Sequence, residues 1–248
     1  MDKSDEIIAG RHPVLEALKA GEQLEKIILH HGAHGPAIDQ IRSLARQRGV
    51  VVVEANKERF RELGEGTDQG VVALRSDVTY AEIEDLLQIA KERNEPPFLL
   101  ILDEIEDPHN LGALIRTAEC AGVHGVIIPK HHSATVSSTV TKAAAGATAY
   151  VRIAKVTNIA QTLDELKSLG LWIVGTDSAG EKAYDGIDYN GPIAVVIGSE
   201  GKGIRRLVKE KCDFLVRIPL YGKIASLNAS VAGALVLFEA AKVRHRPR

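Results

Sequence analysis

Asn110 and Arg116 lie in the stretch "DEIEDPHNLGALIRTAECAG" (103–122). This stretch begins with mostly polar residues and continues with a pattern typical of a helix. Its apolar positions follow the spacing i, i+3, i+4, i+7 and are predicted to face a core: Leu111, Leu114, Ile115 and Ala118. Asn110 precedes them as a candidate N-cap. Arg116 shares a helix side with Gly112, which leaves space beside the guanidinium near the helix N-terminus. This position suits an anion, because unpaired amides also point outward there; a capped surface helix with a solvated arginine is the alternative.

A second candidate is Glu200, which lies among three glycines in "VVIGSEGKGI" (195–204), after an apolar run and before a helical segment. A glycine-rich loop in this place often holds a cofactor, but its spacing matches neither the P-loop nor the dinucleotide-binding fingerprint. A carboxylate would repel phosphates and better suits a cationic or hydroxyl-bearing ligand. The alternative is a tight turn between a strand and a helix.

Ser226 and Asn228 are polar residues just before an apolar segment, within "IPLYGKIASLNASVAGALVLFEA" (218–240). Residues 231–238 are apolar on all sides, which predicts a buried helix. Small residues in the same segment allow close backbone approach: Ala229, Ala232, Gly233 and Ala234. The two polar side chains either cap this helix or belong to a binding site.

The elements that must position these residues form two alternations of helices and strands. Residues 1–75 have the pattern of a small α/β unit, with helices at 12–21, 37–49 and 57–66 and strands at 24–32, 49–56 and 69–76. The charged, helical segment 76–97 ends at a proline pair and is predicted to be the connection.

Residues 98–248 form the second alternation, which predicts an α/β domain with a parallel sheet. Its apolar runs are near-continuous, as in strands buried on both faces: 98–105, 125–129, 150–154, 171–177, 193–200 and 214–220. Helical segments lie between several of them: 111–121, 159–169 and 204–211. Because ligands bind at the carboxyl ends of such strands, the candidate residues are expected to gather there.

The composition is that of an ordinary globular protein, with 248 residues, 45% of them hydrophobic, and a formal net charge of -2. This charge argues against bulk attraction to nucleic acid but allows a local basic patch. No apolar run approaches the roughly 20 residues that a bilayer requires, and the N-terminus lacks a signal-peptide pattern, so no membrane is expected. Cys120 and Cys212 have no metal or redox spacing, and we expect a cytoplasmic protein with reduced thiols.

Two further charged or polar segments are expected to be solvated. The tail "AKVRHRPR" (241–248) carries four basic residues and no acid. We expect it to be partly disordered, with RNA contact as the alternative. The histidines of "HHGAHG" (30–35) are expected to lie in a loop, because no cysteine or carboxylate has ligand spacing to them; no metal is predicted.

Together the three stretches resemble the SpoU family of RNA ribose 2′-O-methyltransferases, of the SPOUT class. The family patterns are N-x-x-x-x-x-R, I-G-x-E-x-x-G and I-P-x-x-G-x-x-x-S-L-N. Here they stand as Asn110 with Arg116, as the loop 197–203, and as 218–222 with 226–228. The N-terminal "AGRHPVLEAL" and "DQGVVAL" are similar to the substrate-binding domain of many members, which has the L30e ribosomal-protein fold. In length and layout the chain is most similar to bacterial members that methylate a guanosine ribose in large-subunit ribosomal RNA.

The resemblance implies a fold, a cofactor and a dimer. The domain at 98–248 would contain a deep trefoil knot, in which the last helix threads through a preceding loop. The smaller α/β domain at 1–75 would bind RNA. S-adenosylmethionine would lie in loops at the strand ends, and the residues that match cofactor contacts by position are Thr176, Gly198, Ser199, Gly201, Ile218, Leu220 and Leu227. Members form homodimers through the knot region, where Asn110 and Arg116 would complete a site.

The same resemblance assigns the transfer chemistry to five polar residues: Asn110, Arg116, Glu200, Ser226 and Asn228. Family proposals treat the counterpart of Arg116 as a base, but a guanidinium in a protein rarely releases its proton. We expect Arg116 to anchor a phosphate and to stabilise the developing alkoxide. Asn110 would orient Arg116 or the ribose, and Glu200 would hold Arg116 or the substrate. Ser226 and Asn228 would order the cofactor loop.

The predicted activity is therefore 2′-O-methylation of a ribose, with a guanosine of 23S ribosomal RNA as the expected target. Transfer RNA is an alternative substrate, but the N-terminal domain favours the ribosomal one. A different class is a non-catalytic RNA-binding or ribosome-assembly factor on the same fold. The set of five polar residues argues against that class, because a protein that only binds has no need of it.

Overall fold

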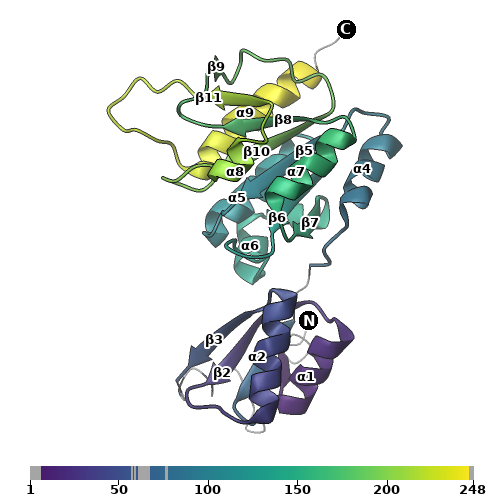
Figure 1. Ribbon diagram of the computed structural model, residues 1–248, viewed down its shortest axis with the longest axis vertical. Helices are drawn as coiled ribbons and strands as arrows, with labels where there is room; N and C mark the ends of the chain where they lie inside the picture. The colour runs from purple at the N-terminus through teal and green to yellow at the C-terminus, as the bar shows by residue number, and fades with distance from the viewer. Residues whose placement is uncertain (1–6, 57, 59, 61–67, 76–77, 246–248) are drawn as a thin grey trace. The chain divides into compact units, whose positions relative to one another are not determined.

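The computed structural model describes residues 7–56, 58, 60, 68–75 and 78–245, which fall into two compact units, Met1–Thr79 and Tyr80–Arg248 (Figure 1). Each unit has its own sheet and its own buried core. The architecture is thus a larger α/β unit with a parallel sheet preceded by a smaller α/β unit, as predicted.

The sheet of the first unit has four strands in the order β1-β4-β2-β3, with bounds Ile7–Ala9, Val71–Arg75, Leu24–His30 and Val51–Ala55. β4 is antiparallel to β1 and β2, whereas β2 and β3 are parallel. Helices α1 (Arg11–Ala20) and α2 (Pro36–Arg48) each end at a glycine in the left-handed conformation and pack into one core with this sheet. The predicted helix at 57–66 lies mostly outside the described residues.

The second unit has seven parallel strands in the order β7-β6-β5-β10-β8-β11-β9. In chain order from β5 to β11 their bounds are Phe98–Asp103, Gly125–Pro129, Arg152–Val156, Trp172–Thr176, Lys182–Ala183, Ile193–Gly198 and Phe214–Arg217. All predicted apolar runs are strands of this sheet, and the prediction of a parallel sheet is confirmed. Every residue of β5 and β10 is buried, as continuous apolar runs indicate for central strands.

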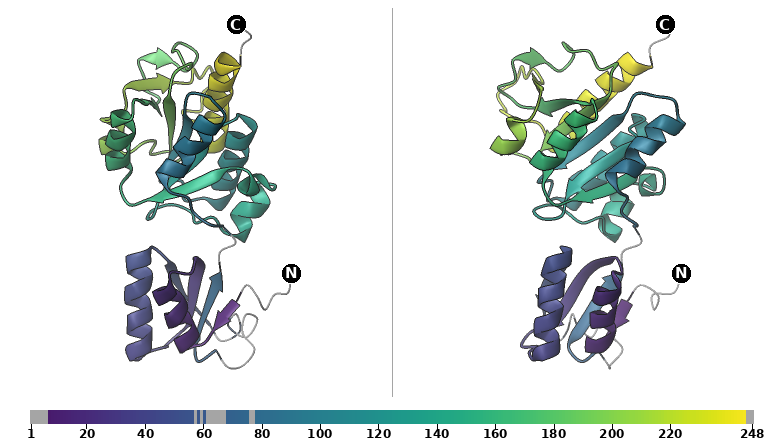
Figure 2. Two further views of the ribbon diagram at one scale, coloured as in Figure 1. Left: turned by 90° about the vertical axis from the view of Figure 1, so that its right-hand side faces the viewer. Right: turned by 45° about the vertical axis from the view of Figure 1, so that its right-hand side comes forward.

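Helices cover both faces of this sheet (Figure 2): α4 (Ile83–Glu92), α5 (Pro108–Cys120), α6 (Ser138–Ala143), α7 (Ile159–Ser168), α8 (Arg206–Lys209) and α9 (Ala229–Arg244). Side chains alternate along β10, so Val196 shares a core with α4, α7 and α8, whereas Ile197 lies near α9. A Cβ on Gly233 of α9 would collide with Leu114 of α5, which confirms the predicted close approach of this helix. The deep trefoil knot implied by the resemblance stays a prediction.

The segment 76–97, predicted to be a connection, differs in the structure from residue 80 onward. Ala81 forms a bridge with Ala154 of β7, and α4 packs on the sheet with Leu86 fully buried. Gly125 makes this packing possible, because a Cβ there would lie 2.5 Å from Leu86 Cδ2. The helix therefore belongs to the core of the second unit. Its many charged residues, which are exposed, gave its sequence the pattern of a solvated connection.

Arg244 has a structural role that the predicted solvated tail did not include. Its guanidinium donates to the backbone oxygens of Gly191 (2.8 Å), Tyr189 (3.1 Å) and Pro96, and it lies 5.0 Å from the ring centroid of Phe98. This arginine fastens the end of α9 to the loops at the amino end of the sheet. The expectation of a solvated tail is therefore wrong for Arg244, and residues 246–248 lie outside the described part of the chain.

The environment of His124 predicts how the free energy of unfolding depends on pH. Its Nδ1 accepts the backbone N–H of Phe98 (2.9 Å), its Nε2 lies 3.0 Å from Glu95 Oε2, and burial lowers its pKa more than Glu95 raises it. The folded state thus binds fewer protons here than the unfolded state, so this contribution is complete above about pH 6.5 and is lost as pH falls below it.

We expect His124→Asn, whose amide oxygen can still accept from Phe98, to lose less stability than wild type between pH 7.5 and 5.5. Urea denaturation at both pH values measures the difference. Parallel losses in the two proteins would contradict a role for His124 titration.

Candidate active site

Three of the predicted site residues meet at the carboxyl edge of the second sheet. Asn228 Nδ2 donates to Asn110 Oδ1 (2.9 Å) and to Glu200 Oε2 (3.3 Å). Asn110 comes from the first turn of α5, Glu200 from the loop after β10, and Asn228 from the start of α9. The topology thus joins residues that are 118 and 28 positions apart in the chain.

Asn228 is also the N-cap of α9. Its Oδ1 accepts from the backbone N–H groups of Ser230 (2.9 Å) and Val231 (3.4 Å) and from the Ser230 hydroxyl (2.5 Å). The predicted helix cap is therefore confirmed for Asn228. Its role in a binding site stays a prediction, and the cap is compatible with it because the oxygen caps the helix while the nitrogen donates to the cluster.

The glycine-rich loop after β10 is a tight turn whose geometry depends on its glycines. Ser199 and Gly203 exchange backbone hydrogen bonds (3.2 and 2.9 Å), and Gly201 and Gly203 have φ of 82° and 69°. Left-handed backbone conformations favour glycine, which explains this composition. The turn holds Glu200 outward, where it reaches Asn228.

Asp103 is a site-supporting residue that the sequence analysis missed. It ends β5, is fully buried, and accepts from the backbone N–H and the Nε of Arg205 (2.8 Å each). Arg205 Nη2 lies 2.6 Å from the same carboxylate. Because Arg205 directly follows the glycine-rich loop and Ile204, this pair fastens the loop to the central strand. A carboxylate ending an otherwise apolar run was the available signal.

A cavity of about 460 Å³ lies beside the cluster and is walled by three loops at strand ends. All seven residues matched to cofactor contacts line this cavity: Thr176, Gly198, Ser199, Gly201, Ile218, Leu220 and Leu227. Ser226 lines it as well. Ser226 therefore lies at the cavity and not in the hydrogen-bonded cluster of Asn110, Glu200 and Asn228.

The cavity wall combines apolar side chains with both signs of charge. Asp177 and Glu200 supply carboxylates, and Lys202 and Lys209 supply ammonium groups. Burial raises the pKa of Asp177, but the hydrogen bond from Lys209, the N–H of Ala179 and the charge of Lys209 together lower it below its ordinary value. Asp177 is thus ionised at neutral pH, and the cavity suits a ligand that carries both charges.

A second cavity, of about 230 Å³, adjoins the first. Residues 104–107 and Asn110 form its own wall, and it shares four lining residues with the larger cavity: Ser199, Glu200, Lys202 and Ala229. Two adjoining cavities with a hydrogen-bonded polar cluster between them suit a reaction in which a group passes from one bound molecule to another.

Arg116 does not join the cluster within one chain. It is exposed on α5, and the described residues supply no hydrogen bond or ion pair to it. The expected space beside Gly112 is filled by α6, because a Cβ on Gly112 would lie 2.5 Å from Ala143 Cβ. The predicted N-cap was also wrong, since Asp107 caps α5 by accepting from His109 N–H (3.0 Å), and Asn110 lies in the first turn.

α9 is less buried than its apolar sequence predicts. Val231, Leu235 and Phe238 are 47%, 38% and 50% exposed, and together with Ala113 and Thr117 of α5 they line a shallow apolar groove. The helix buries only the side that faces α5 and β10, with Gly233, Val236 and Leu237. An exposed apolar stripe of this kind is typical of an interaction surface.

The glycine-rich loop requires a residue without a side chain at position 198, and this requirement can be tested. A Cβ at this position would overlap the backbone of Gly203 and Ile204, which cannot move without opening the turn. We expect Gly198→Ala to lower the free energy of unfolding by about 1–3 kcal/mol, as overpacking does in other cores. Gly191→Ala is the matched control, because a Cβ there meets nothing within 4 Å. Urea denaturation compares the two, and equal small losses would contradict this account.

The residues that the structure describes contain no group of three or more His, Cys, Asp and Glu side chains placed to hold a metal ion. Among the helices that the structure describes, none is both long and apolar enough to cross a membrane.

Two family models match this chain. The model of the SpoU rRNA Methylase family matches residues 97–238, and the model for RNA 2′-O ribose methyltransferase substrate binding matches residues 7–81. The two matches lie on the larger and the smaller unit, respectively.

Individual relatives match nearly the full length of the chain. YacO of Bacillus subtilis, assigned by its name to the TrmH family of tRNA/rRNA methyltransferases, is 43% identical over 245 residues, which cover 99% of this chain and 98% of YacO. The structure of an AdoMet-bound rRNA methyltransferase from Sinorhizobium meliloti is 26% identical, with a TM-score of 0.59 over 96% of this chain and 87% of that one. The structure of an RNA 2′-O ribose methyltransferase is 27% identical, with a TM-score of 0.56 over 96% and 88% of the two chains.

Proposed function

The chain belongs to the SpoU rRNA methylase family, and on that basis we propose that it transfers a methyl group from S-adenosylmethionine to a ribose 2′-hydroxyl, that of a guanosine in 23S ribosomal RNA. The observation that carries the proposal is the cluster of Asn110, Glu200 and Asn228 beside a cavity lined by the residues matched to cofactor contacts. Residues 98–248 would perform the transfer and residues 1–75 would bind the RNA.

The larger cavity fits S-adenosylmethionine in size and chemistry. Its volume of about 460 Å³ is within the range of small-molecule sites. Ile218, Leu220 and Leu227 offer apolar surface to an adenine ring, and the carboxylates of Asp177 and Glu200 suit the positive sulfonium and amino groups. When bound, the cofactor supplies an electrophilic methyl group.

The residues of the chain would align the ribose and stabilise its oxygen. A 2′-hydroxyl is a weak nucleophile, so orientation beside the cofactor supplies much of the rate. Asn110, held by Asn228, would orient the ribose, and Glu200 would accept a hydrogen bond from the substrate or from Arg116. Arg116 would bind a phosphate and stabilise the developing alkoxide. Ser226 would order the cofactor loop from the rim of the cavity.

A homodimer would bring Arg116 to the site. Arg116 lies on α5 one residue before Thr117 and three after Ala113, both of which line the apolar groove against α9. A second copy seated on Val231, Leu235 and Phe238 would bury this stripe and place Arg116 at the interface. Light scattering on the purified chain tests this arrangement, and a monomeric mass at assay concentrations would contradict it.

The substrate assignment rests on the smaller unit. Residues 7–81 match a model for RNA 2′-O ribose methyltransferase substrate binding, and the presence of this domain favours ribosomal RNA over transfer RNA as the substrate. The name of YacO covers both tRNA and rRNA, so transfer RNA is the second candidate substrate.

Methyl transfer from labelled S-adenosylmethionine tests the proposal, with unmodified ribosomal RNA and bulk transfer RNA assayed in parallel. We expect label at one ribosomal ribose, mapped by resistance to alkaline cleavage. Label only in transfer RNA would keep the chemistry and overturn the substrate. No label in either RNA or in ribosomal particles, with the cofactor bound, would favour a binding-only protein.

A further inference from the structure

Two lysines lie together at the carboxyl edge of β6 and β7. Lys155 is in β7, in register with Ile128, and Lys130 directly follows β6 and donates its backbone N–H to Val156 O (2.8 Å). Lys155 Nζ lies 4.6 Å from the ring centroid of Tyr80. An aromatic ring therefore faces one of the two ammonium groups, and strand pairing keeps their backbones adjacent.

Neither lysine forms an ion pair with a carboxylate of the part of the chain that the structure describes. The ion pairs among the described residues include neither Lys130 nor Lys155, whereas Lys167, Lys209 and Lys211 of the same unit all pair with aspartates. Burial and then the charge of Lys130 lower the pKa of Lys155 to about 8. Lys155 is partly buried and Lys130 is exposed, and two cations that repel each other are stabilised when an anion binds between them.

The lysine pair is connected to the candidate active site. The loop that begins at Lys130 is tied to Ile105, whose backbone oxygen accepts from Ala134 N–H (2.8 Å) and from the Ser133 hydroxyl (3.3 Å). Ile105 lines the smaller cavity together with Asn110. An anion bound at the lysines would therefore lie on the side of the smaller cavity, where the acceptor nucleotide is expected. The larger cavity is on the other side of the site.

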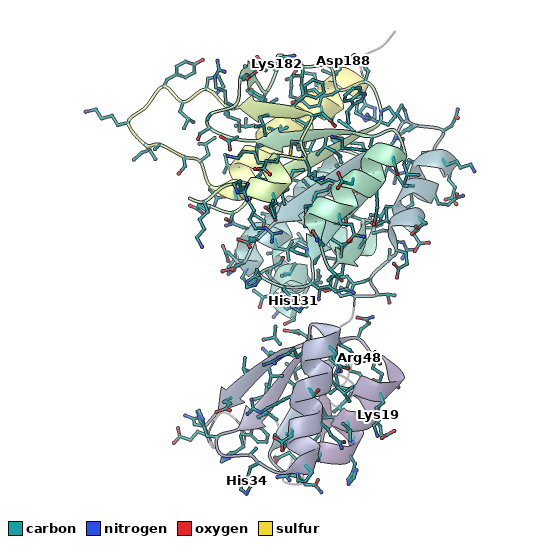
Figure 3. All side chains as sticks on the ribbon, viewed as in Figure 1. Lys19, His34, Arg48, His131, Lys182 and Asp188 are labelled. Carbon is teal, nitrogen blue, oxygen red and sulfur yellow. The ribbon has the colours of Figure 1, made fainter. Side chains whose placement is uncertain are left out.

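We propose that Lys130 and Lys155 form a binding site for a backbone phosphate of the RNA, close to the nucleotide that is modified. This inference rests on the proposed function, because it takes the smaller cavity as the place of the acceptor nucleotide. Each ammonium group donates to phosphate oxygens in a charge-assisted hydrogen bond. His131 and His132 follow Lys130 in the same loop, and both are exposed; Figure 3 labels His131.

Single variants Lys130→Gln and Lys155→Met test the site by direct binding of an unmodified 23S ribosomal RNA transcript at several salt concentrations. Loss of one phosphate contact is expected to weaken binding about tenfold near physiological salt and to reduce the slope of log affinity against log salt by about 1. Lys155→Arg keeps the charge and is expected to bind like wild type. Cofactor affinity should be unchanged in all three, since neither lysine lines the larger cavity.

Lys182→Met is the matched control. Lys182 lies on β9 of the same sheet and also faces an aromatic ring, with Nζ 5.3 Å from the centroid of Phe214, but it is at the far end of the strand order from β7 (Figure 3). It is expected to change RNA binding less than twofold, a limit that covers ordinary surface substitutions.

The outcomes separate this inference from the proposed function. Wild-type affinity and salt slope in both Lys130→Gln and Lys155→Met would overturn the phosphate site, even if the wild-type protein methylates ribosomal RNA. An equal loss in Lys182→Met would overturn it too, because any surface lysine would then suffice. A reduced slope confined to the two site variants would support it, even if the methylated RNA is a transfer RNA. Thermal melting monitored by circular dichroism verifies that each variant is folded.

Discussion

Arg116→Ala is expected to abolish methyl transfer, with kcat lowered about 10³-fold, while S-adenosylmethionine still binds. Removing one donor that stabilises a developing negative charge typically costs 10²–10³-fold, and Arg116 is proposed to hold a phosphate as well. The side chain is exposed, and the described residues supply no partner, so its loss should change the free energy of unfolding by less than about 0.5 kcal/mol. Single-turnover methyl transfer and calorimetric titration of the cofactor measure the two effects separately.

Subunit complementation tests where Arg116 acts. If it completes the site of the partner subunit, a heterodimer of Arg116→Ala and Asn228→Asp chains has one site with both defects and one with neither. Random mixing should then restore about a quarter of wild-type activity, because half of the dimers are mixed and each has one intact site. No recovery would place Arg116 in the site of its own chain. Full activity in Arg116→Lys would count against a bidentate contact.

Asn228→Asp is expected to lower kcat about 10²-fold with little loss of stability. Aspartate keeps an oxygen that accepts from Ser230 N–H, so α9 stays capped. It loses the Nδ2 donor to Asn110 (2.9 Å) and places a second carboxylate beside Glu200. Misplacement of the substrate by about 1 Å can cost this much in rate.

Asn228→Ala is the comparison that separates the two roles of this residue. Alanine removes the cap and the donor together, so it should lower the free energy of unfolding by about 1 kcal/mol as well as the rate. Near wild-type kcat in Asn228→Asp would show that the hydrogen bond to Asn110 does not matter for transfer. Equal destabilisation of the two variants would show that the cap does not separate from the cluster.

Sheet strands and cavity residues were predictable for a common reason. A strand covered on both faces needs an unbroken apolar run, as in β5 and β10, and such runs are visible without a structure. In a parallel sheet the carboxyl ends of the strands share one edge, so residues that follow the runs must lie near one another. The seven residues matched to cofactor contacts accordingly line one cavity.

The features that the sequence did not predict have a different cause. Asp103 pairs with Arg205 across 102 positions, and Arg244 reaches Pro96 across 148, so neither contact leaves a local pattern. The cap of α5 was misplaced because several polar residues precede the helix, and only the backbone geometry shows that Asp107 accepts from His109. Short β9 has no apolar run at all, since it pairs with β11 at the exposed edge of the sheet.

Local chemistry in the chain was enough to predict the parallel α/β architecture and the glycine-dependent turn, and the family resemblance added the polar residues that are proposed for the site. It was not enough to establish which of them touch. Asn228 meets Asn110 and Glu200, Arg116 does not, and a continuous apolar helix leaves Val231, Leu235 and Phe238 exposed. The periodicity of a segment indicates its secondary structure and its apolar side. Contacts between segments depend instead on the strand order β5-β10-β8, which brings distant segments to one edge of the sheet. Which side of α9 is covered depends in turn on where α5 packs, and that is a property of the folded chain alone.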